Sequence, residues 1–359
     1  MKIGLVSYYS RNYGAILQGY ALQEILQGLG HEVIAINRGW GDYGHLVWNF
    51  HYSFPQFLKK TLINYPFDDF VRKELRMSKP ILSADDLKNI SNSLDAVIAG
   101  SDQIWNVDTI KYMQHYFFLD WVDSSIPKYS YAASFGKDSF CTNTSEKLII
   151  RDLLSQYKAI SVREYSGIRI CKDEFGMTAS QHIDPTLLLS VDKYKELFRH
   201  IKKPAMPYFC TYLLDTSLKK ESLINRLKIS MRTERIDNYA QTVRFKQQLM
   251  HKSMRMPTVY QWLANIANSQ FVITDSFHGT VFSIIFNKPF ICLNNSERGS
   301  ARFESLLGNL GLMDRLVDLD KIEYEGILDL LNKKIDYTKV ESELDKLRIE
   351  SLKYLKSIC

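Results

Sequence analysis

The stretch KIGLVSYYSRNYGAILQGYALQEILQGLGHEVIAIN, residues 2–37, decides the fold class of this 359-residue chain. Residues 2–9 are rich in Val, Ile and Tyr, which is typical of a strand. Apolar residues then recur at helical spacing from Leu17 to Leu29, glycines follow, and HEVIAIN (31–37) has the composition of a second strand. A strand–helix–strand unit of this kind predicts a parallel sheet that starts at the N-terminus.

The alternation of strand-like and helical patterns continues along the chain. Strand-like runs occupy 94–100, 128–136, 157–164 and 180–189; beyond a Lys- and Pro-containing break at 202–207 they occupy 208–214, 233–239, 270–274 and 288–294. An apolar stripe from Val340 to Leu355 predicts one last helix. We therefore predict an α/β protein with one βαβ-rich domain over 1–195, a second over 196–335, and a terminal helix over 336–359 that packs back on the body. The carboxyl edges of the two sheets should face a cleft between the domains.

Composition restricts the class of protein. A hydrophobic content of 45% with 24% charged residues is typical of a globular domain, and no apolar run is long enough to cross a bilayer. The net charge of +6 is mild and no basic run marks a nucleic-acid-binding arm. The five scattered cysteines form no CxxC pair, which argues against both a disulfide framework and a zinc site. With no secretory pattern at Met1, we expect a cytoplasmic protein with reduced cysteines.

ITDSFHGTVFSIIFNKPFI, residues 273–291, places polar side chains on a turn between an apolar strand and an apolar helix. Asp275, Ser276, His278, Gly279 and Thr280 gather there. The first N–H groups of a helix bear partial positive charge and favour a phosphate or carboxylate, and a glycine lets a ligand approach the backbone. His278 could shuttle a proton. The alternative is that His278 belongs to the helix cap, with Asp275 or Ser276 as the capping residue.

Two further strand ends carry polar residues. Asn12, Tyr13 and Gly14 stand where the first strand meets the first helix, and they serve either ligand contact or turn formation. The GxGxxG fingerprint of dinucleotide-binding folds is absent from this turn. Asp102 follows the strand at 94–100 and could act as a base or orient a sugar hydroxyl; capping of the next helix is the alternative.

Three arginines are candidates for an anion clamp. Arg163 ends the strand-like run at 157–164, and Arg298 and Arg302 follow the strand at 288–294. A guanidinium can bind a phosphate or carboxylate with two parallel hydrogen bonds. The alternatives are a surface ion pair between Arg163 and Glu164, and ordinary solvated charges at the other two positions.

Six stretches, in this order along residues 1–310, resemble the polysaccharide pyruvyl transferase family. They are YYSRNYGAILQGYALQ, VIAGSDQIWN, SYAASFG, ISVREYSGI, HIDPTLLL and TDSFHGTVFSIIFNKPF. The resemblance implies two Rossmann-like domains in a GT-B arrangement with the active site in the cleft between them. It also implies a ketal-forming transferase, which moves a pyruvyl group from phosphoenolpyruvate to two hydroxyls of a sugar and releases phosphate.

The same resemblance implies roles for the candidate residues. His278 matches the family's motif histidine, the candidate general acid, and Arg163, Arg298, Arg302 and the helix start at Gly279–Thr280 would hold the donor anion. Asp102 or Asp275 would take a hydroxyl proton. The chemistry demands no metal and no cofactor beyond the donor substrate. The acceptor would be a lipid-linked or nucleotide-linked sugar of capsule or exopolysaccharide synthesis, at the inner face of the cell membrane, with the aromatic segment 39–56 as a source of contacts.

Two other functions are compatible with these features. A GT-B glycosyltransferase would use the helix start near His278 to hold the pyrophosphate of a nucleotide-sugar donor. A catalytically idle partner protein in a polysaccharide assembly complex would show no stabilisation by any anionic donor. Binding of phosphoenolpyruvate, as opposed to a nucleotide, discriminates among the three.

Overall fold

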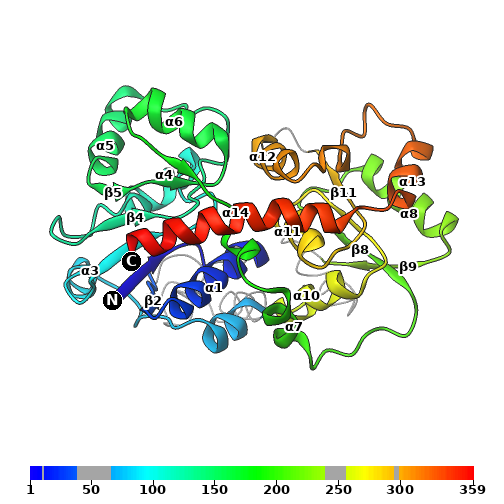
Figure 1. Ribbon diagram of the computed structural model, residues 1–359, viewed down its shortest axis with the longest axis horizontal. Coiled ribbons are helices and arrows are strands. Elements are labelled where there is room, and N and C mark those ends of the chain that lie inside the picture. Colours follow the sequence, from blue (N-terminus) through cyan, green and yellow to red (C-terminus); the bar gives the residue numbers. More distant parts are fainter. Residues whose placement is uncertain (10–11, 39–65, 239–255, 295–298) are drawn as a thin grey trace, which may run out of the picture.

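The computed structural model describes residues 1–9, 12–38, 66–238, 256–294 and 299–359. Two parallel sheets, each with helices packed around it, lie on either side of a shared helical layer (Figure 1). Arg298 and the aromatic segment 39–56 lie outside the described residues, so the expectations for them stay predictions.

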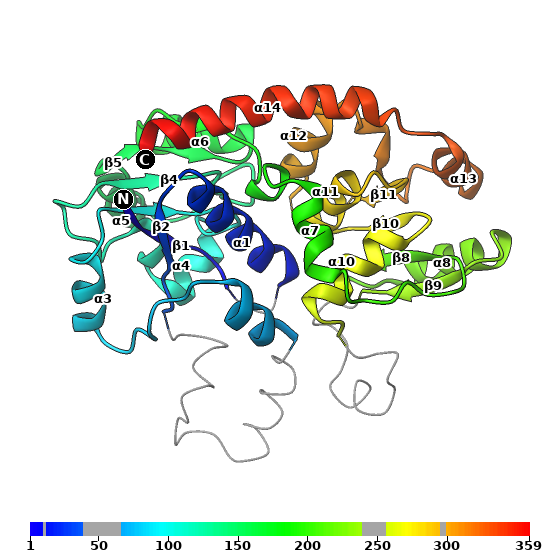
Figure 2. The same ribbon diagram turned by 60° about the horizontal axis from the view of Figure 1, so that its bottom comes forward.

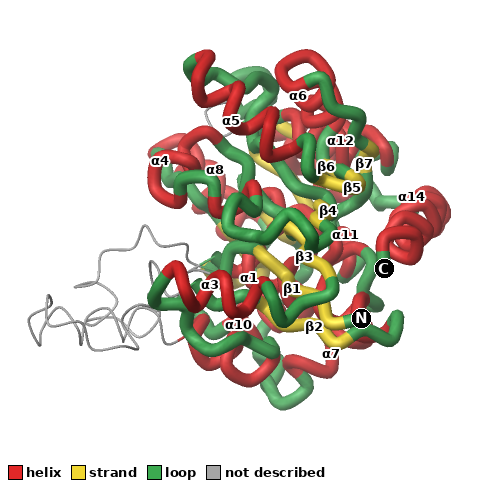
Figure 3. Tube along the Cα trace, turned by 90° about the vertical axis from the view of Figure 1, so that its left-hand side faces the viewer, coloured by secondary structure: helices red, strands yellow, loops and turns green. Residues whose placement is uncertain are grey.

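The first sheet has the order β2-β1-β3-β4-β5, and all its pairings are parallel. Figure 3 shows β1, β3, β4 and β5 side by side in this domain. Its elements are β1 (Lys2–Val6), α1 (Tyr13–Gly28), β2 (Glu32–Ala35), α3 (Ala84–Ser91), β3 (Ala96–Ala99), α4 (Val107–Met113), η2 (Tyr116–Phe118), β4 (Lys128–Ser130), α5 (Thr144–Leu154), β5 (Tyr157–Ala159) and α6 (Tyr165–Phe175). The βαβ unit predicted from residues 2–37 is confirmed, with Ile3 paired to Val33 of β2 and to Ala96 of β3.

The second sheet has the order β12-β11-β10-β8-β9 and is also entirely parallel. Its elements, with the helices around it, are α7 (Val191–Phe198), β8 (Tyr208–Tyr212), α8 (Leu218–Ser230), β9 (Glu234–Asp237), α10 (Val259–Asn268), β10 (Val272–Thr274), α11 (Phe277–Ile285), β11 (Phe290–Leu293), α12 (Ala301–Asn309), η6 (Met313–Arg315), β12 (Leu316–Val317) and α13 (Tyr324–Asn332). In each sheet the first and third strands along the chain are neighbours. The second strand lies on one side of this pair and the later strands lie on the other. Ligands bind at such switch points in open α/β sheets, beyond the carboxyl ends of the strands.

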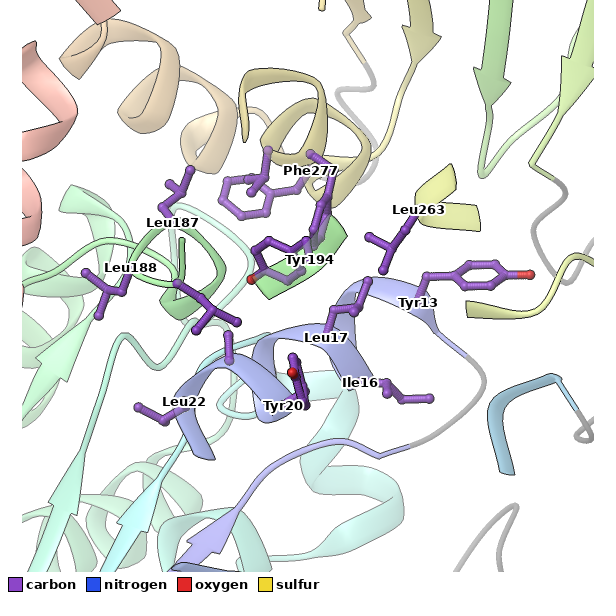
Figure 4. Packing of buried hydrophobic residues seen from close by; sticks show 14 of the residues in the cluster. Tyr13, Ile16, Leu17, Tyr20, Leu22, Leu187, Leu188, Tyr194, Leu263 and Phe277 are labelled. Atoms are coloured by element: carbon purple, nitrogen blue, oxygen red, sulfur yellow. The ribbon is translucent and has the colours of Figure 1, made fainter. Parts of the chain in front are cut away.

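A continuous hydrophobic core joins the two domains. It contains residues of α1, α7, α10 and α11, and Figure 4 shows Leu17 and Tyr20 of α1 beside Tyr194, Leu263 and Phe277 from the other elements. Burial of α1 on most of its circumference explains its apolar sequence. The two domains therefore meet through packed side chains, which fixes the loops at the sheet edges relative to each other.

The strand predicted over 157–164 is divided in the structure. β5 ends at Ala159, and β6 (Ser161–Val162) pairs instead with β7 (Ser180–Gln181) in a small separate sheet. Side-chain hydrogen bonds replace ladder bonds here: Ser161 N donates to Ser130 Oγ at 2.8 Å, and Ser130 Oγ donates to Ser161 O at 3.0 Å. The division turns the chain so that the residues after β6 and β7, Arg163 and Asp184, come together.

The last helix, α14 (Tyr337–Ile358), extends across both domains (Figure 2). Near its start Tyr337 donates to Lys288 O at 2.6 Å, and near its end Tyr354 donates to Ser130 O at 2.8 Å. Ser351 Oγ accepts a hydrogen bond from Ile183 N at 3.3 Å. Within the part of the chain that the structure describes, none of the helices combines the length and hydrophobicity needed to cross a membrane.

His182 predicts acid sensitivity of the fold. Its buried ring lies 4.4 Å from the Tyr354 ring, Nδ1 lies 2.7 Å from Ser161 Oγ, and burial lowers the pKa of His182 to about 4. A pKa below the ordinary 6.5 means that this site contributes full stability above pH 6.5 and loses it as pH falls toward 4. At about 1.4 kcal/mol per pH unit, the free energy of unfolding of the wild type should fall by roughly 3 kcal/mol over that range because of this residue.

The comparison is between the wild type and His182→Phe, which keeps a ring against Tyr354 and has nothing to titrate. Urea unfolding at pH 7, 5.5 and 4 should show that the wild type loses stability relative to His182→Phe as pH falls. A difference that stays constant across this range would contradict the buried neutral histidine.

Candidate functional site between the domains

Asp184 is the centre of a buried cluster at the domain interface. It caps the short 3₁₀ helix η3 (Pro185–Leu187), and Oδ1 accepts from Thr186 N at 3.0 Å and from Thr186 Oγ1 at 2.6 Å. Oδ2 accepts from Arg163 Nη1 at 2.7 Å and from Ser101 Oγ at 3.2 Å. Loops after β3, β6 and β7 thus converge on one carboxylate.

Arg163 is a buried cation, with 3% of its side chain exposed. Besides Asp184 it faces Asp102, whose Oδ1 lies 3.7 Å from Nη2, and Glu164, whose Oε2 lies 3.9 Å from Nε. The guanidinium carbon lies 4.4 Å from the centroid of the Phe277 ring. Nε and Nη2 have no hydrogen-bond partner among the described residues. The alternative of a surface ion pair with Glu164 is wrong, because both side chains are buried.

His278 enters the same cluster from the second domain. It is the second residue of α11, and its Nε2 lies 3.4 Å from Asp184 Oδ2 without a hydrogen-bond partner in the described chain. On its other side the ring contacts α1: a Cβ added at Gly14 would lie 2.0 Å from Nδ1. Gly14 is therefore required for the close approach of the two domains at His278.

The ionisation of Asp184 follows from these neighbours. Burial by itself raises the pKa of Asp184, but the imidazole of His278, the guanidinium of Arg163 and the Thr186 hydroxyl outweigh it. The pKa of Asp184 therefore lies well below its ordinary value. An ionised carboxylate that binds Arg163 of one domain and faces His278 of the other thus lies between the two halves of the site.

Asp102 lies at the partly exposed edge of the cluster. Its φ of 83° is a left-handed value that is uncommon for residues other than glycine, and such strain gathers at functional sites. Its backbone carbonyl accepts from Ser134 N at 2.9 Å and its Oδ1 from Gln103 N at 2.8 Å. The next helix, α4, is capped by Asn106, so the capping alternative for Asp102 does not apply.

Arg302 of α12 lies near Phe277, at the border of the cluster. Its guanidinium carbon is 5.9 Å from the Phe277 centroid, and with the amide oxygen turned toward α12, Gln103 accepts from Nη1 and Nη2 at 2.5 and 2.9 Å. Arg302 and Arg163 line one cavity between β7, α12 and α14 that offers about 70 Å³ to the centres of water molecules. One water needs about 10–15 Å³ by this measure, so the cavity has room for several waters or a small anion.

The remaining candidates on the turn before α11 have partners within the protein. Ser276 is the cap of α11, and its Oγ accepts from Gly279 N at 3.4 Å. A Cβ at Gly279 would lie 2.2 Å from Thr274 Oγ1, so this glycine lets α11 start against β10. Thr280 Oγ1 donates to Ser276 O at 3.1 Å. These three residues shape the helix start that presents His278.

Asp275 is oriented toward the loop after β8. Its Oδ1 accepts from Leu214 N at 2.6 Å, and its Oδ2 accepts from Asp215 N at 3.2 Å and from Lys220 Nζ at 2.7 Å. A carboxylate with three donors is committed to ordering this loop. The structure thus brings Arg163, Asp102 and His278 together and gives Asp275 other partners.

The loop before α1 also has structural contacts. Asn12 caps α1, accepting from Gly14 N at 2.9 Å and Ala15 N at 3.2 Å. Tyr13 is buried, donates to Pro257 O at 2.7 Å and stacks on Trp262 with ring centroids 5.2 Å apart. Both residues set the position of α1 at the interface.

Asp184 was not among the residues singled out from the sequence. It lies in HIDPTLLL (182–189), within the strand-like run at 180–189, where an acid stands directly before a proline. That position is a sequence signal for a polar residue at the carboxyl edge of a strand. The pairing with Arg163 and His278 could not be read from it.

The comparisons with known proteins agree with this geometry. The model of the family described as polysaccharide pyruvyl transferase matches residues 12–297, which is most of the chain. The chain belongs to this family. It is accordingly a transferase that acts in polysaccharide modification. Among curated proteins, none matches the chain.

Solved structures share the fold of this pyruvyl transferase family member at low identity. A putative UDP-N-acetylglucosamine 2-epimerase from Listeria monocytogenes is 12% identical with a TM-score of 0.54, over 94% of this chain and 90% of that one. UDP-GlcNAc 2-epimerase from Neisseria meningitidis, bound to UDP-GlcNAc, is 10% identical with a TM-score of 0.53, over 100% and 99%. The enzyme from Methanocaldococcus jannaschii is 14% identical with a TM-score of 0.51, over 94% and 93%. The likeness concerns the fold, and it confirms two Rossmann-like domains in the GT-B arrangement.

Proposed function

We propose that this protein transfers a pyruvyl group from phosphoenolpyruvate to two hydroxyls of a sugar in a polysaccharide precursor, forming a pyruvate ketal and releasing phosphate. The observation that carries the proposal is the buried cluster of Arg163, Asp184 and His278. It joins an anion-binding group of one domain to an acid–base group of the other, in a chain of this family.

Phosphoenolpyruvate carries a carboxylate and a phosphate, and its binding requires cations that are not already saturated. Arg163 offers Nε and Nη2, which have no hydrogen-bond partner among the described residues. Arg302 lines the same cavity, and the ring of Phe277 adds an apolar surface to its lining. Charge-assisted hydrogen bonds to guanidinium groups supply both affinity and orientation. Arg298 remains a candidate for the same role.

The reaction then has a balanced course. His278 delivers a proton to the methylene carbon of phosphoenolpyruvate, and the neighbouring carbon becomes electrophilic. One sugar hydroxyl forms a C–O bond to that carbon and gives up its proton to a base. The second hydroxyl forms another C–O bond as the carbon–oxygen bond to phosphate breaks, and the departing phosphate takes its proton. The products are a ketal and inorganic phosphate, and no cofactor beyond the donor is required.

Asp102 is the better-placed candidate for the base. Its carboxylate is partly exposed at the edge of the cluster, whereas that of Asp275 has three donors. The acceptor in this proposal is a lipid-linked or nucleotide-linked sugar at the cytoplasmic face of the membrane. The partly exposed edge near Asp102 would contact the amphipathic surface of the sugar and the two hydroxyls that react.

Thermal unfolding with phosphoenolpyruvate tests the donor. At about 100 times its dissociation constant a ligand stabilises the native state by about 2.7 kcal/mol, which gives a measurable rise in Tm. We expect this rise for the wild type. In Arg163→Lys, which keeps a charge beside Asp184 but loses the planar fork, donor affinity should fall about ten- to a hundredfold, as for the loss of one charged hydrogen bond.

The same experiment addresses the alternative of a nucleotide-sugar glycosyltransferase. UDP-GlcNAc is the appropriate second probe, because a structure with this fold holds it. Stabilisation by UDP-GlcNAc or UDP without any response to phosphoenolpyruvate, with and without sugar acceptors, would overturn the pyruvyl proposal in favour of that alternative.

A further inference from the structure

The two oxygens of Asp184 have different partners. Oδ1 is held by the backbone N–H and the hydroxyl of Thr186, both from the same short helix. Oδ2 receives Arg163 Nη1 and Ser101 Oγ and faces His278 Nε2 at 3.4 Å. One oxygen therefore anchors the carboxylate, and the other lies between the anion-binding arginine and the imidazole.

We infer that Asp184 is a positioning residue that orients Arg163 toward the donor anion and holds the ring of His278 in place for proton transfer to the donor. The inference rests on the proposed function, because it assigns His278 the protonation step. It adds a third member to the site, one that acts through the other two and does not itself react.

The geometry fits a carboxylate that faces the ring of His278 and fixes its place in the site. Nε2 lies 3.4 Å from Oδ2 in a buried site, where polar interactions are strong because the effective dielectric is low. Nε2 has no hydrogen-bond partner among the described residues. The ring cannot turn away toward α1, because Gly14 is in close contact with it.

The same oxygen sets the direction of Arg163. By binding Nη1, Asp184 leaves Nη2 and Nε facing the rest of the cluster without hydrogen-bond partners in the described chain. The cost of an arginine with unsatisfied donors is reduced when an anion arrives. Asp184 therefore partly neutralises Arg163 and sets the direction of its remaining donors.

Other charged and titratable groups around His278 come from three neighbouring elements. Arg163 binds the same oxygen, Oδ2, and Asp102 lies 3.7 Å from Arg163 and offsets its charge. Tyr194 of α7 donates to Thr186 O at 2.9 Å and stays neutral, since burial raises its pKa. α1 contributes the uncharged Gly14. Asp184 is thus the acidic group paired with His278 among the described residues.

Asp184→Asn tests the inference, since it keeps the shape of the side chain and removes its charge. Phosphoenolpyruvate should bind as tightly as to the wild type or more tightly, because Arg163 loses its counter-charge. Phosphate release with a sugar acceptor should fall on the order of 100-fold, as for a misplaced catalytic group. The loss should fall on kcat and leave KM for phosphoenolpyruvate unchanged or lower, a split that a merely destabilised protein would not show.

Thr186→Val is the matched control. It removes the hydroxyl hydrogen bond to Oδ1 while the carboxylate and its contact with Arg163 remain, so it should lower Tm but leave the binding of phosphoenolpyruvate as in the wild type. If Asp184→Asn weakens donor binding and turnover together, Asp184 is only structural and the inference is overturned. Donor binding is measured without turnover, so it also tests Asp184 if the wild type binds phosphoenolpyruvate but proves inactive on it, an outcome that would count against the proposed function alone.

Discussion

His278→Asn should still bind phosphoenolpyruvate but release phosphate from it about 10²- to 10⁴-fold more slowly than the wild type, the range expected for loss of a general acid. The reason is positional. His278 is fixed between Asp184 and Gly14 at the start of α11, and its Nε2 has no hydrogen-bond partner in the described chain. Asparagine retains a polar side chain there but cannot deliver a proton at neutral pH.

The measurement is phosphate release with the acceptor that the wild type uses fastest among nucleotide-linked hexoses, together with the rise in Tm caused by phosphoenolpyruvate. His200→Asn is the control, because His200 is exposed at the end of α7 and packs only against Tyr260 among the described aromatic residues. It should behave as the wild type in both assays. Equal turnover by His278→Asn and the wild type would falsify the assignment of His278 as the acid.

Gly14→Ala should be among the most damaging single-methyl changes in the chain. The added carbon would lie 2.0 Å from Nδ1 and 2.6 Å from the Cβ of His278, so the clash reaches the root of the side chain and a rotation of the ring does not relieve it. α1 and α11 must then separate. We expect a loss of about 3 kcal/mol in the free energy of unfolding, the upper end for overpacked cores, and a fall in turnover on the order of 100-fold.

Gly28→Ala is the matched control in the same helix. No described atom lies within 4 Å of a Cβ at Gly28, and alanine there should stabilise the protein by about 0.4–1 kcal/mol through the unfolded state. Urea unfolding and turnover of both variants separate the two effects. Wild-type stability and turnover in Gly14→Ala would mean that the domains do not meet as closely at His278 as the structure describes.

Much of this protein could be predicted from local sequence pattern. The strand–helix–strand unit at 2–37, the parallel alternation in both halves and the last helix each leave a periodic signal in neighbouring residues, because burial of one face selects apolar side chains at a fixed spacing. The polar residues after strands were also visible, since the carboxyl edge of a parallel sheet is where the chain is free of ladder hydrogen bonds. Arg163, Asp102 and His278 were found in this way.

Tertiary structure alone decided which of those residues act together. Asp184 lies 94 positions before His278 in the chain, and the contact exists only because the domains pack through α1 and α11. Asp275 has the residue type and position of a catalytic acid, yet its donors come from the loop after β8. Hydrogen-bond partners and charge pairs depend on the distance between side chains in space, and a distance between segments remote in sequence leaves no periodic signal. The sequence by itself therefore determined the elements and the edge at which the site lies, and the packing of the two domains determined its composition.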